Sequence, residues 1–301
     1  MAGTDLSPRH PGPRDAGPRP AANELAGLDA LDAHHGTGRT PLRRVLVAKA
    51  LPPALAVALV LTLWQVLASA HVTDDYVLPP PAAVWDSLAD LWFKGTLFDV
   101  VWTSVWRGLS GFLLALAIGT PLGLLVARVR PVRAAIGPIL SGLQSLPSVA
   151  WVPPAVLWLG LDDSMMYAVI LLGATPSIAG GLVSGIDQVP PLLLRAGRSL
   201  GATGLRGARY VVMPAAFPGY LAGLKQGWAF SWRSLMAAEI IASSPDLGIG
   251  LGQLLESGRE TSDMARIFLA IGLILLVGVA VELLVFGPLE RRMLRGRGLR
   301  T

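Results

Sequence analysis

Apolar residues in this chain gather into six long stretches that polar and charged segments separate. A helix needs about 20 residues to cross the hydrocarbon core of a bilayer, and each stretch reaches that length. Backbone polar groups in lipid must be satisfied within the segment, which favours helices. The pattern predicts an all-α membrane protein with six transmembrane helices, at about residues 45–70, 107–127, 138–160, 165–186, 219–243 and 266–288.

The third stretch is the least regular of the six, because Pro147 and Pro153 interrupt it. Proline removes a hydrogen bond from a helix interior and bends or breaks the helix. We therefore expect a broken third span, and kinks at Pro52, Pro121 and Pro176, where neighbouring groups satisfy the freed carbonyls.

A shorter amphipathic run lies between the first two spans and begins after three consecutive prolines, residues 79–81. Its apolar residues recur at helical spacing, which predicts a helix lying in the membrane interface. Tryptophan is enriched at the headgroup level. We expect Trp85, Trp92, Trp102 and Trp106 to form an aromatic belt there.

The composition agrees with a membrane protein and excludes several kinds of chemistry. Of the 301 residues, 52% are hydrophobic and 15% charged, and the mean hydropathy is +0.55. Cysteine is absent and the four histidines lie outside the apolar stretches, so thiolate metal sites and imidazole catalysis within the spans are excluded. We expect no metal site and no nucleic-acid partner, and membrane lipid as the surroundings.

The distribution of cations predicts the orientation. Most of the 25 Lys and Arg residues lie before the first span, after the second, between the fourth and fifth, and after the sixth. Carboxylates outnumber the cations Lys94, Arg107, Arg259 and Arg266 in the other segments. Since cytoplasmic flanks collect Lys and Arg, both termini are expected in the cytoplasm of a multi-pass inner-membrane protein.

The chain is expected to have three parts. Residues 1–44 are rich in Pro, Gly and Arg without an apolar run, which predicts a disordered cytoplasmic tail. Residues 45–295 form the transmembrane domain, which includes a basic cytoplasmic loop at 187–218. Residues 296–301 form a cytoplasmic C-terminal tail.

The basic loop contains the stretch Leu192 to Gly219, whose pattern is that of two short helices. Pro190 is suited to begin the first helix, and Gly201 to end it in a left-handed conformation. The second helix is expected from Leu205 to Val212, stopped before Pro214. Such a loop either docks on a partner protein or lies on anionic headgroups.

The residue spacing in the loop favours docking. Ala196 and Gly201, followed after nine residues by an apolar run that ends at Pro214, resemble the EAA loop (EAA-x3-G-x9-I-x-L-P) of ABC-importer permeases. The loop also stands between the fourth and fifth of six spans. Arg195 departs from the family pattern, which usually has Glu there, and Gly197 stands where the family has Ala.

The resemblance covers roughly residues 45 to 295 and is to the nitrate/sulfonate/taurine branch of these permeases. It implies a MetI-like helical bundle, a pair of permease subunits (expected as a homodimer), a separate ABC ATPase and an extracytoplasmic substrate-binding protein. The matching motifs are Leu78-Pro79, Ser104-x2-Arg107, Gly111-Phe112, Gly119-x-Pro121-x-Gly123, the run Pro154 to Gly160, and Ala237-Ala238-Glu239.

The same resemblance implies that the loop transmits movement from the ATPase to the spans. No G-x4-G-K-[ST] phosphate loop occurs in the sequence, so we expect no cofactor in this chain and ATP bound by the partner subunit. The residues expected to couple to the ATPase are Arg195, Ala196, Arg198, Leu200, Gly201, Ala202, Thr203, Leu205, Arg206 and Pro214.

Ionisable residues within the spans are candidates for function, because they are costly at membrane depth unless paired or facing water. Lys225 of the fifth span and Glu282 of the sixth are expected at similar depth, as a structural ion pair. Arg233 either lines a pathway for an anion or forms an internal bridge to Glu239 or another acid. The residues expected to line the pathway are Gln144, Ser148, Gln226, Arg233 and Glu239.

These observations predict the permease subunit of an ABC importer, not itself an enzyme, that carries a small anion such as an aliphatic sulfonate, taurine or nitrate. A secondary carrier is the alternative, but Glu239 is the one carboxylate near mid-membrane that fits ion coupling. An intramembrane hydrolase would need a Ser/His, paired Asp or metal constellation that the spans lack.

Overall fold

The computed structural model describes residues 42–70, 74, 76–242 and 247–296, and every regular element in these ranges is a helix. The chain divides into two units, one ending at Val60 and the other beginning at Leu61. The elements are α2 (Leu42–Ser69), α3 (Pro81–Phe93), α4 (Thr96–Arg128), α5 (Arg130–Ser145), η1 (Ser148–Trp151), α6 (Val152–Leu159), α7 (Asp163–Asp187), α8 (Pro191–Ser199), α9 (Gly204–Gly207), η2 (Ala208–Val212), α10 (Met213–Ile241), α11 (Leu251–Glu260), α12 (Met264–Val281), η4 (Glu282–Phe286) and α13 (Gly287–Gly296).

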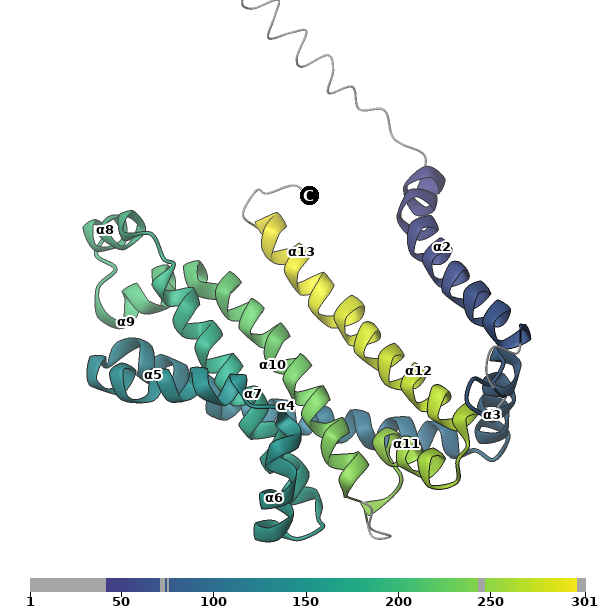
Figure 1. Ribbon diagram of the computed structural model, residues 1–301. Helices are drawn as coiled ribbons and strands as arrows, with labels where there is room; N and C mark the ends of the chain where they lie inside the picture. The colour runs from purple at the N-terminus through teal and green to yellow at the C-terminus, as the bar shows by residue number, and fades with distance from the viewer. Residues whose placement is uncertain (1–41, 71–73, 75, 243–246, 297–301) are drawn as a thin grey trace, which may run out of the picture. The chain divides into compact units, whose positions relative to one another are not determined.

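Helix α7 is the centre of the second unit and packs against both α4 and α10 (Figure 1). Two pairs of glycines bring α7 and α10 together, Gly181 and Gly185 on α7 and Gly219 and Gly223 on α10. A Cβ atom placed on Gly223 would lie 2.6 Å from the Cα of Gly181, so the two backbones touch. Small residues four apart allow this close approach between helices in a bilayer, where packing rather than water exclusion drives association.

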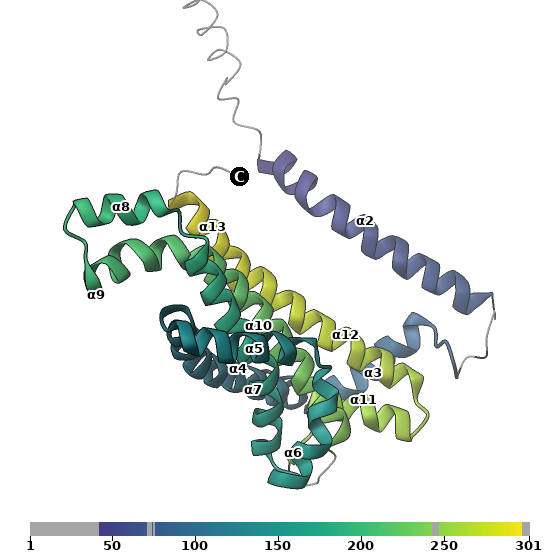
Figure 2. The same ribbon diagram turned by 60° about the vertical axis from the view of Figure 1, so that its left-hand side comes forward.

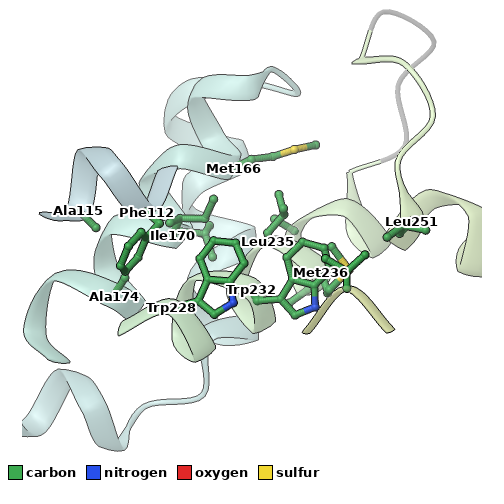
Figure 3. Close-up of a cluster of buried hydrophobic side chains, with 14 of the residues drawn as sticks. Phe112, Ala115, Met166, Ile170, Ala174, Trp228, Trp232, Leu235, Met236 and Leu251 are labelled. Carbon is green, nitrogen blue, oxygen red and sulfur yellow. The ribbon is translucent and has the colours of Figure 1, made fainter. Parts of the chain in front are cut away.

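Aromatic and aliphatic side chains fill the remaining space between α4, α7, α10 and α11 (Figure 3). Phe112 of α4 meets the edge of Trp228 of α10 at a centroid distance of 5.6 Å, and Trp228 stacks on Trp232 at 6.0 Å. Ile170 of α7 is wholly buried beside them. Helices α4, α7 and α10 therefore form one packed body.

The predicted all-helical class is confirmed, whereas the count of six spans stays a prediction. In the described ranges, four helices are long and apolar enough to cross a membrane, and a bent pair of helices makes a possible fifth. The four are Leu51–Ser69, Thr96–Arg128, Asp163–Asp187 and Met264–Arg295. Helix α10 carries three ionisable residues and is not among them.

The expected break in the third span is confirmed. Helix α5 ends at Ser145, and the helical segment Ser148–Leu159 continues at an angle of 105° to it. Pro147 lies in the extended linker between them. By contrast, α4 and α7 continue as helices through Pro121, which is exposed, and Pro176, which is buried.

The predicted amphipathic helix between the first two spans is present as α3, which begins at Pro81. Trp85 and Trp92 of α3 and Trp102 and Trp106 of α4 are all more than half exposed, and Trp102 stacks on Trp106 at 6.2 Å. Their exposure agrees with a position at the membrane interface, which remains a prediction.

The predicted tails fall largely outside the described residues. Residues 1–41 and 297–301 belong to this part, as do the four histidines, His10, His34, His35 and His71. The last three residues of the predicted N-terminal tail, 42–44, begin helix α2.

Candidate functional site

The basic loop forms a helical hairpin that begins with α8 at Pro191 (Figure 2). Helix α8 ends at Ser199 and is followed, as predicted, by a left-handed Gly201, whose φ is +80°. The Ala202 N–H donates to the Gly197 carbonyl at 2.8 Å and the Gly201 N–H to the Arg198 carbonyl at 3.0 Å. This pair of bonds is the Schellman arrangement, which needs a left-handed residue that glycine supplies without steric cost.

A close contact at Gly197 fixes the hairpin. Gly197 is the one buried residue of α8, and a Cβ there would lie 2.7 Å from a methyl group of Val211. Glycine at this position therefore lets α8 lie directly against η2. The sequence has glycine at position 197 where the family pattern has alanine, and this contact is the physical reason.

The expectation that the second helix of the loop stops before Pro214 is wrong. Helix α9 leads into a π-helical turn, η2, and α10 follows at Met213 without a break. Pro214 lies in the first turn of α10, where its missing N–H and fixed φ are tolerated. The fifth span therefore continues directly into the loop.

The predicted coupling residues occupy three parts of the hairpin. Arg195, Ala196, Arg198 and Leu200 lie on α8 or at its end, and all are exposed. Gly201, Ala202 and Thr203 form the turn, Leu205 and Arg206 lie in α9, and Pro214 is in α10; the side chain of Leu205 is outside the described part.

One face of the hairpin is an apolar hollow of about 810 Å³. Leu200, 87% exposed, and Tyr210, 69% exposed, stand at this hollow. A loop beyond the spans that presents such large apolar side chains to water fits a surface that another protein covers.

A narrow exposed stripe runs along α10. Its members are Ala222, Gln226, Ala229 and Arg233, which recur at intervals of three and four and so share one helix face. Many residues around the stripe are buried against the bundle: Leu221, Gly223, Gly227, Trp228, Ser231, Trp232 and Ser234.

Arg233 has no carboxylate partner within the described part of the chain. Its Nε–H donates to the Ala229 carbonyl at 3.1 Å, and its guanidinium lies over the Phe230 ring at 4.7 Å from the centroid. An ion pair between Arg233 and Glu239, one of the two roles expected for Arg233, is not among the described contacts. Glu239 pairs with Arg107 instead.

Gln144 and Ser148, the other two predicted pathway residues, do not belong to the exposed stripe of α10. Gln144 donates from Nε2 to the Pro176 carbonyl at 3.2 Å, and so ties α5 to α7. Ser148 is the half-buried first residue of η1. Among the described contacts, none joins either residue to Gln226 or Arg233.

Glu239 is wholly buried at the centre of a polar network rather than on the exposed stripe. Ser104 Oγ lies 2.9 and 2.8 Å from its two carboxylate oxygens, and the Gly252 N–H donates to Oε2 at 2.9 Å. Arg107 Nη1 lies 3.4 Å from Oε1. The expected pathway role of Glu239 stays a prediction, since within this chain its carboxylate is already enclosed by these partners.

Arg107 extends the network to two further segments. Its Nε–H donates to Asp163 Oδ1 at 2.9 Å, at the start of α7, and its Nη2 donates to the Leu247 carbonyl. Arg107 is 4% exposed, so this cation of the predicted outer segments is buried within the bundle. A buried guanidinium satisfied by two carboxylates and a carbonyl joins α4 to α7, to α10 and to the segment before α11.

The sequence contains signals for part of this network. The motifs at Ser104, Arg107 and Glu239 were identified as points of family resemblance, but their spacing does not show that they meet. Asp163, Leu247 and Gly252 carry no signal of their own, because their contribution depends on tertiary contacts.

The second cluster of charges joins α10 to the C-terminal helices. Lys225 Nζ lies 2.7 Å from Glu282 Oε1, as expected, and 3.3 Å from Glu290 Oε2. Glu282 begins the π-helical turn η4. Across the described residues, no three His, Asp or Glu side chains are grouped closely enough to hold a metal ion.

Comparison with known proteins places this fold and loop in a class. Residues 119–295 match the family model of the binding-protein-dependent transport system inner membrane component. The chain belongs to this family. It is a permease subunit of an ABC importer, which crosses the inner membrane several times and works with an ATPase and a substrate-binding protein, and it is not an enzyme.

Three similar proteins illustrate the relationship. A Methanocaldococcus jannaschii protein described as an ABC transporter permease is 34% identical, over 79% of this chain and 87% of its own. The taurine transport system permease protein TauC of Escherichia coli is 28% identical, over 78% and 86%. The nitrate import permease protein NrtB of Synechocystis is 27% identical, over 81% and 90%.

The solved structures agree on the fold. The MetNI methionine ABC transporter in its inward-facing conformation aligns with a TM-score of 0.52 at 20% identity, over 65% of this chain and 95% of that one. The MetI-like helical bundle is therefore confirmed as the fold.

Proposed function

We propose that this permease translocates a small anion such as an aliphatic sulfonate, taurine or nitrate, delivered by its binding protein. Relatives named for taurine and nitrate transport support this substrate class. The observation that carries the proposal is Arg233, an exposed guanidinium in the second half of α10 with no carboxylate partner in the residues described. A free guanidinium at membrane depth is costly unless it faces water or meets an anion, and its planar fork matches sulfonate, carboxylate or nitrate oxygens.

The neighbours of Arg233 suit a pathway wall. Ala222 and Ala229 leave room on the stripe, and Gln226 adds a second polar group on the same face. A second copy of the chain, facing this stripe, would complete the pathway. We propose a homodimer for that reason, with Gln144 and Ser148 at the broken third span as weaker contributors.

The proposed topology has both termini in the cytoplasm. The Arg133–Asp187 ion pair, at 2.6 Å, joins the start of α5 to the end of α7, directly before the basic hairpin. The Lys225–Glu290 contact brings α13 to the same half of α10 that leaves the hairpin. Three basic segments thus lie at one end of the bundle, which the positive-inside rule assigns to the cytoplasm.

In this proposal the partner ATPase binds ATP and its closure moves the hairpin from Arg195 to Pro214. Because α10 follows the hairpin without a break, that movement reaches the stripe that bears Arg233. Transport then proceeds by alternating access, and this chain itself holds no nucleotide.

Transport by the reconstituted assembly tests the substrate class. Permease, ATPase and binding protein are combined in proteoliposomes, and ATP-dependent uptake of taurine, an alkane sulfonate and nitrate is measured. Arg233→Gln is expected to lower uptake at least about tenfold with assembly and basal ATP hydrolysis retained, as for loss of one charged contact. Arg292→Gln, a change at an exposed arginine of α13, is the matched control.

Two results would overturn the proposal. Uptake of a neutral or cationic solute alone would reject the anion, and a loss of assembly in Arg233→Gln would assign that residue to structure. Uptake that follows an ion gradient without ATP would indicate a secondary carrier instead.

The absence of native cysteine allows Ser199→Cys and Thr261→Cys to be labelled singly, which tests the topology. Labelling of Ser199→Cys only from outside would reverse the proposed topology.

A further inference from the structure

The contact at Gly197 defines which face of α8 is turned outward. Gly197 lies against Val211 of η2, from which α10 begins. Residues in a helix are separated by 100°, so the side chain two positions earlier points to the opposite side. Arg195 therefore lies at the centre of the outward face, with Leu192 and Ser199 beside it at intervals of three and four.

The hairpin offers cations without any acid of its own. From Leu192 to Gly219 the sequence contains four arginines and no Asp or Glu. Arg195, Arg198, Arg206 and Arg209 are all exposed, and in the portion of the chain that is described none of them pairs with a carboxylate. The nearby Asp187 is already held by Arg133 through two hydrogen bonds, at 2.9 and 2.6 Å.

Apolar anchors flank these cations. Leu192 is 74% exposed on the outward face, and Leu200 projects at the end of the helix. An exposed leucine next to an unpaired guanidinium fits a protein groove with an apolar floor and a carboxylate at its edge.

We propose that the ATPase presents an acidic groove to this hairpin, in which a carboxylate pairs with Arg195 while Leu192 enters the floor. The inference rests on the proposed function, since it describes the contact through which the hairpin would be moved. In this contact the permease supplies the cation and the ATPase supplies the anion.

Anionic lipid is the competing occupant, and the geometry favours the ATPase. The outward face of α8 is turned from η2 and from the start of α10, which leads into the bundle.

Binding of the ATPase to the full permease in nanodiscs tests the proposal. Neutral phosphatidylcholine nanodiscs and nanodiscs containing phosphatidylglycerol are compared over a range of salt. Arg195→Glu is expected to weaken binding at least about tenfold in both, because like charges then face each other in the interface. Arg195→Lys keeps the charge and is expected to stay within about threefold of the unchanged chain.

Arg292→Glu is the matched control, since it reverses a charge on an exposed helical arginine outside the hairpin. Single replacement of ATPase surface carboxylates by lysine should then identify one that restores binding to Arg195→Glu. Unchanged affinity in Arg195→Glu would overturn the proposal, as would an effect confined to anionic nanodiscs, which would assign Arg195 to lipid. Absence of ATPase binding by the unchanged chain would instead reject the proposed assembly, so the two failures are distinguishable.

Discussion

Replacement of Gly223 by alanine tests the contact on which the bundle is built. The new Cβ would lie 2.6 Å from the Cα of Gly181 and 3.1 Å from the Ser177 carbonyl oxygen. Carbon atoms in contact are normally about 3.5–4.0 Å apart. The two helices must therefore separate by about 1 Å, since the obstructing atoms belong to backbone and cannot rotate away.

The expected cost follows from two opposing effects. Overpacking of a close contact destabilises by about 1–3 kcal/mol, and the upper end applies because backbone obstructs the methyl group. Alanine in place of glycine in a helix stabilises by about 1 kcal/mol. The net loss for Gly223→Ala is then about 2 kcal/mol.

Thermal unfolding in detergent, followed by tryptophan fluorescence, measures this loss. Gly142→Ala is the matched control, because a Cβ on Gly142 of α5 meets nothing within 4 Å. The control should keep or slightly raise the midpoint, whereas Gly223→Ala should lower it by roughly 5 °C. Equal midpoints in the two variants would refute the close approach of α7 and α10.

Three further predictions concern charges and the loop. Arg107→Met should lower the free energy of unfolding by about 3–5 kcal/mol, because it leaves Glu239 buried without its cation. Denaturant titrations measure this loss, and adding Glu239→Gln should recover part of it. A loss below about 1 kcal/mol would contradict the buried pair. Lys225→Met should cost about 1 kcal/mol or less, because Lys225 and Glu282 are a third to a half exposed, and a double-mutant cycle with Glu282→Gln that gives more than about 2 kcal/mol would show that the pair is buried. Gly201→Ala should speed hydrogen exchange in α8, because a left-handed residue with a Cβ costs about 1–2 kcal/mol, whereas Gly201→Asn should change it less; equal exchange in all three chains would argue against the left-handed turn.

The features that depend on local pattern could be predicted from the sequence. Helical membrane-length stretches, the break at Pro147, the amphipathic helix at Pro81 and the left-handed Gly201 each follow from residues within a few positions of one another. The pairing of Lys225 with Glu282 followed from the simple packing of consecutive spans, and the structure brings them to 2.7 Å.

The features that depend on contacts between distant segments could not be predicted from the sequence. The burial of Arg107 is not evident from the sequence, because nothing near it shows that Glu239 and the Leu247 carbonyl will enclose it. The same holds for Glu239, whose burial is decided by Ser104 on α4 and by the backbone of α11. Pro214 misled for a different reason: a proline that ends one helix also suits the first turn of the next, and η2 joins the two.

The packing of α10 limits how movement of the hairpin can reach the rest of the bundle. Helix α10 is continuous from Met213 to Ile241, is pressed backbone to backbone against α7 at Gly181, and has the buried Glu239 in its last turn. Neither the glycine contact nor the buried carboxylate tolerates sliding without exposing or obstructing buried groups. We therefore expect α7 and α10 to move as one body. Any movement of this body relative to α13 should break the ion pairs of Lys225, whose partners are half exposed and whose ion pairs cost little to break.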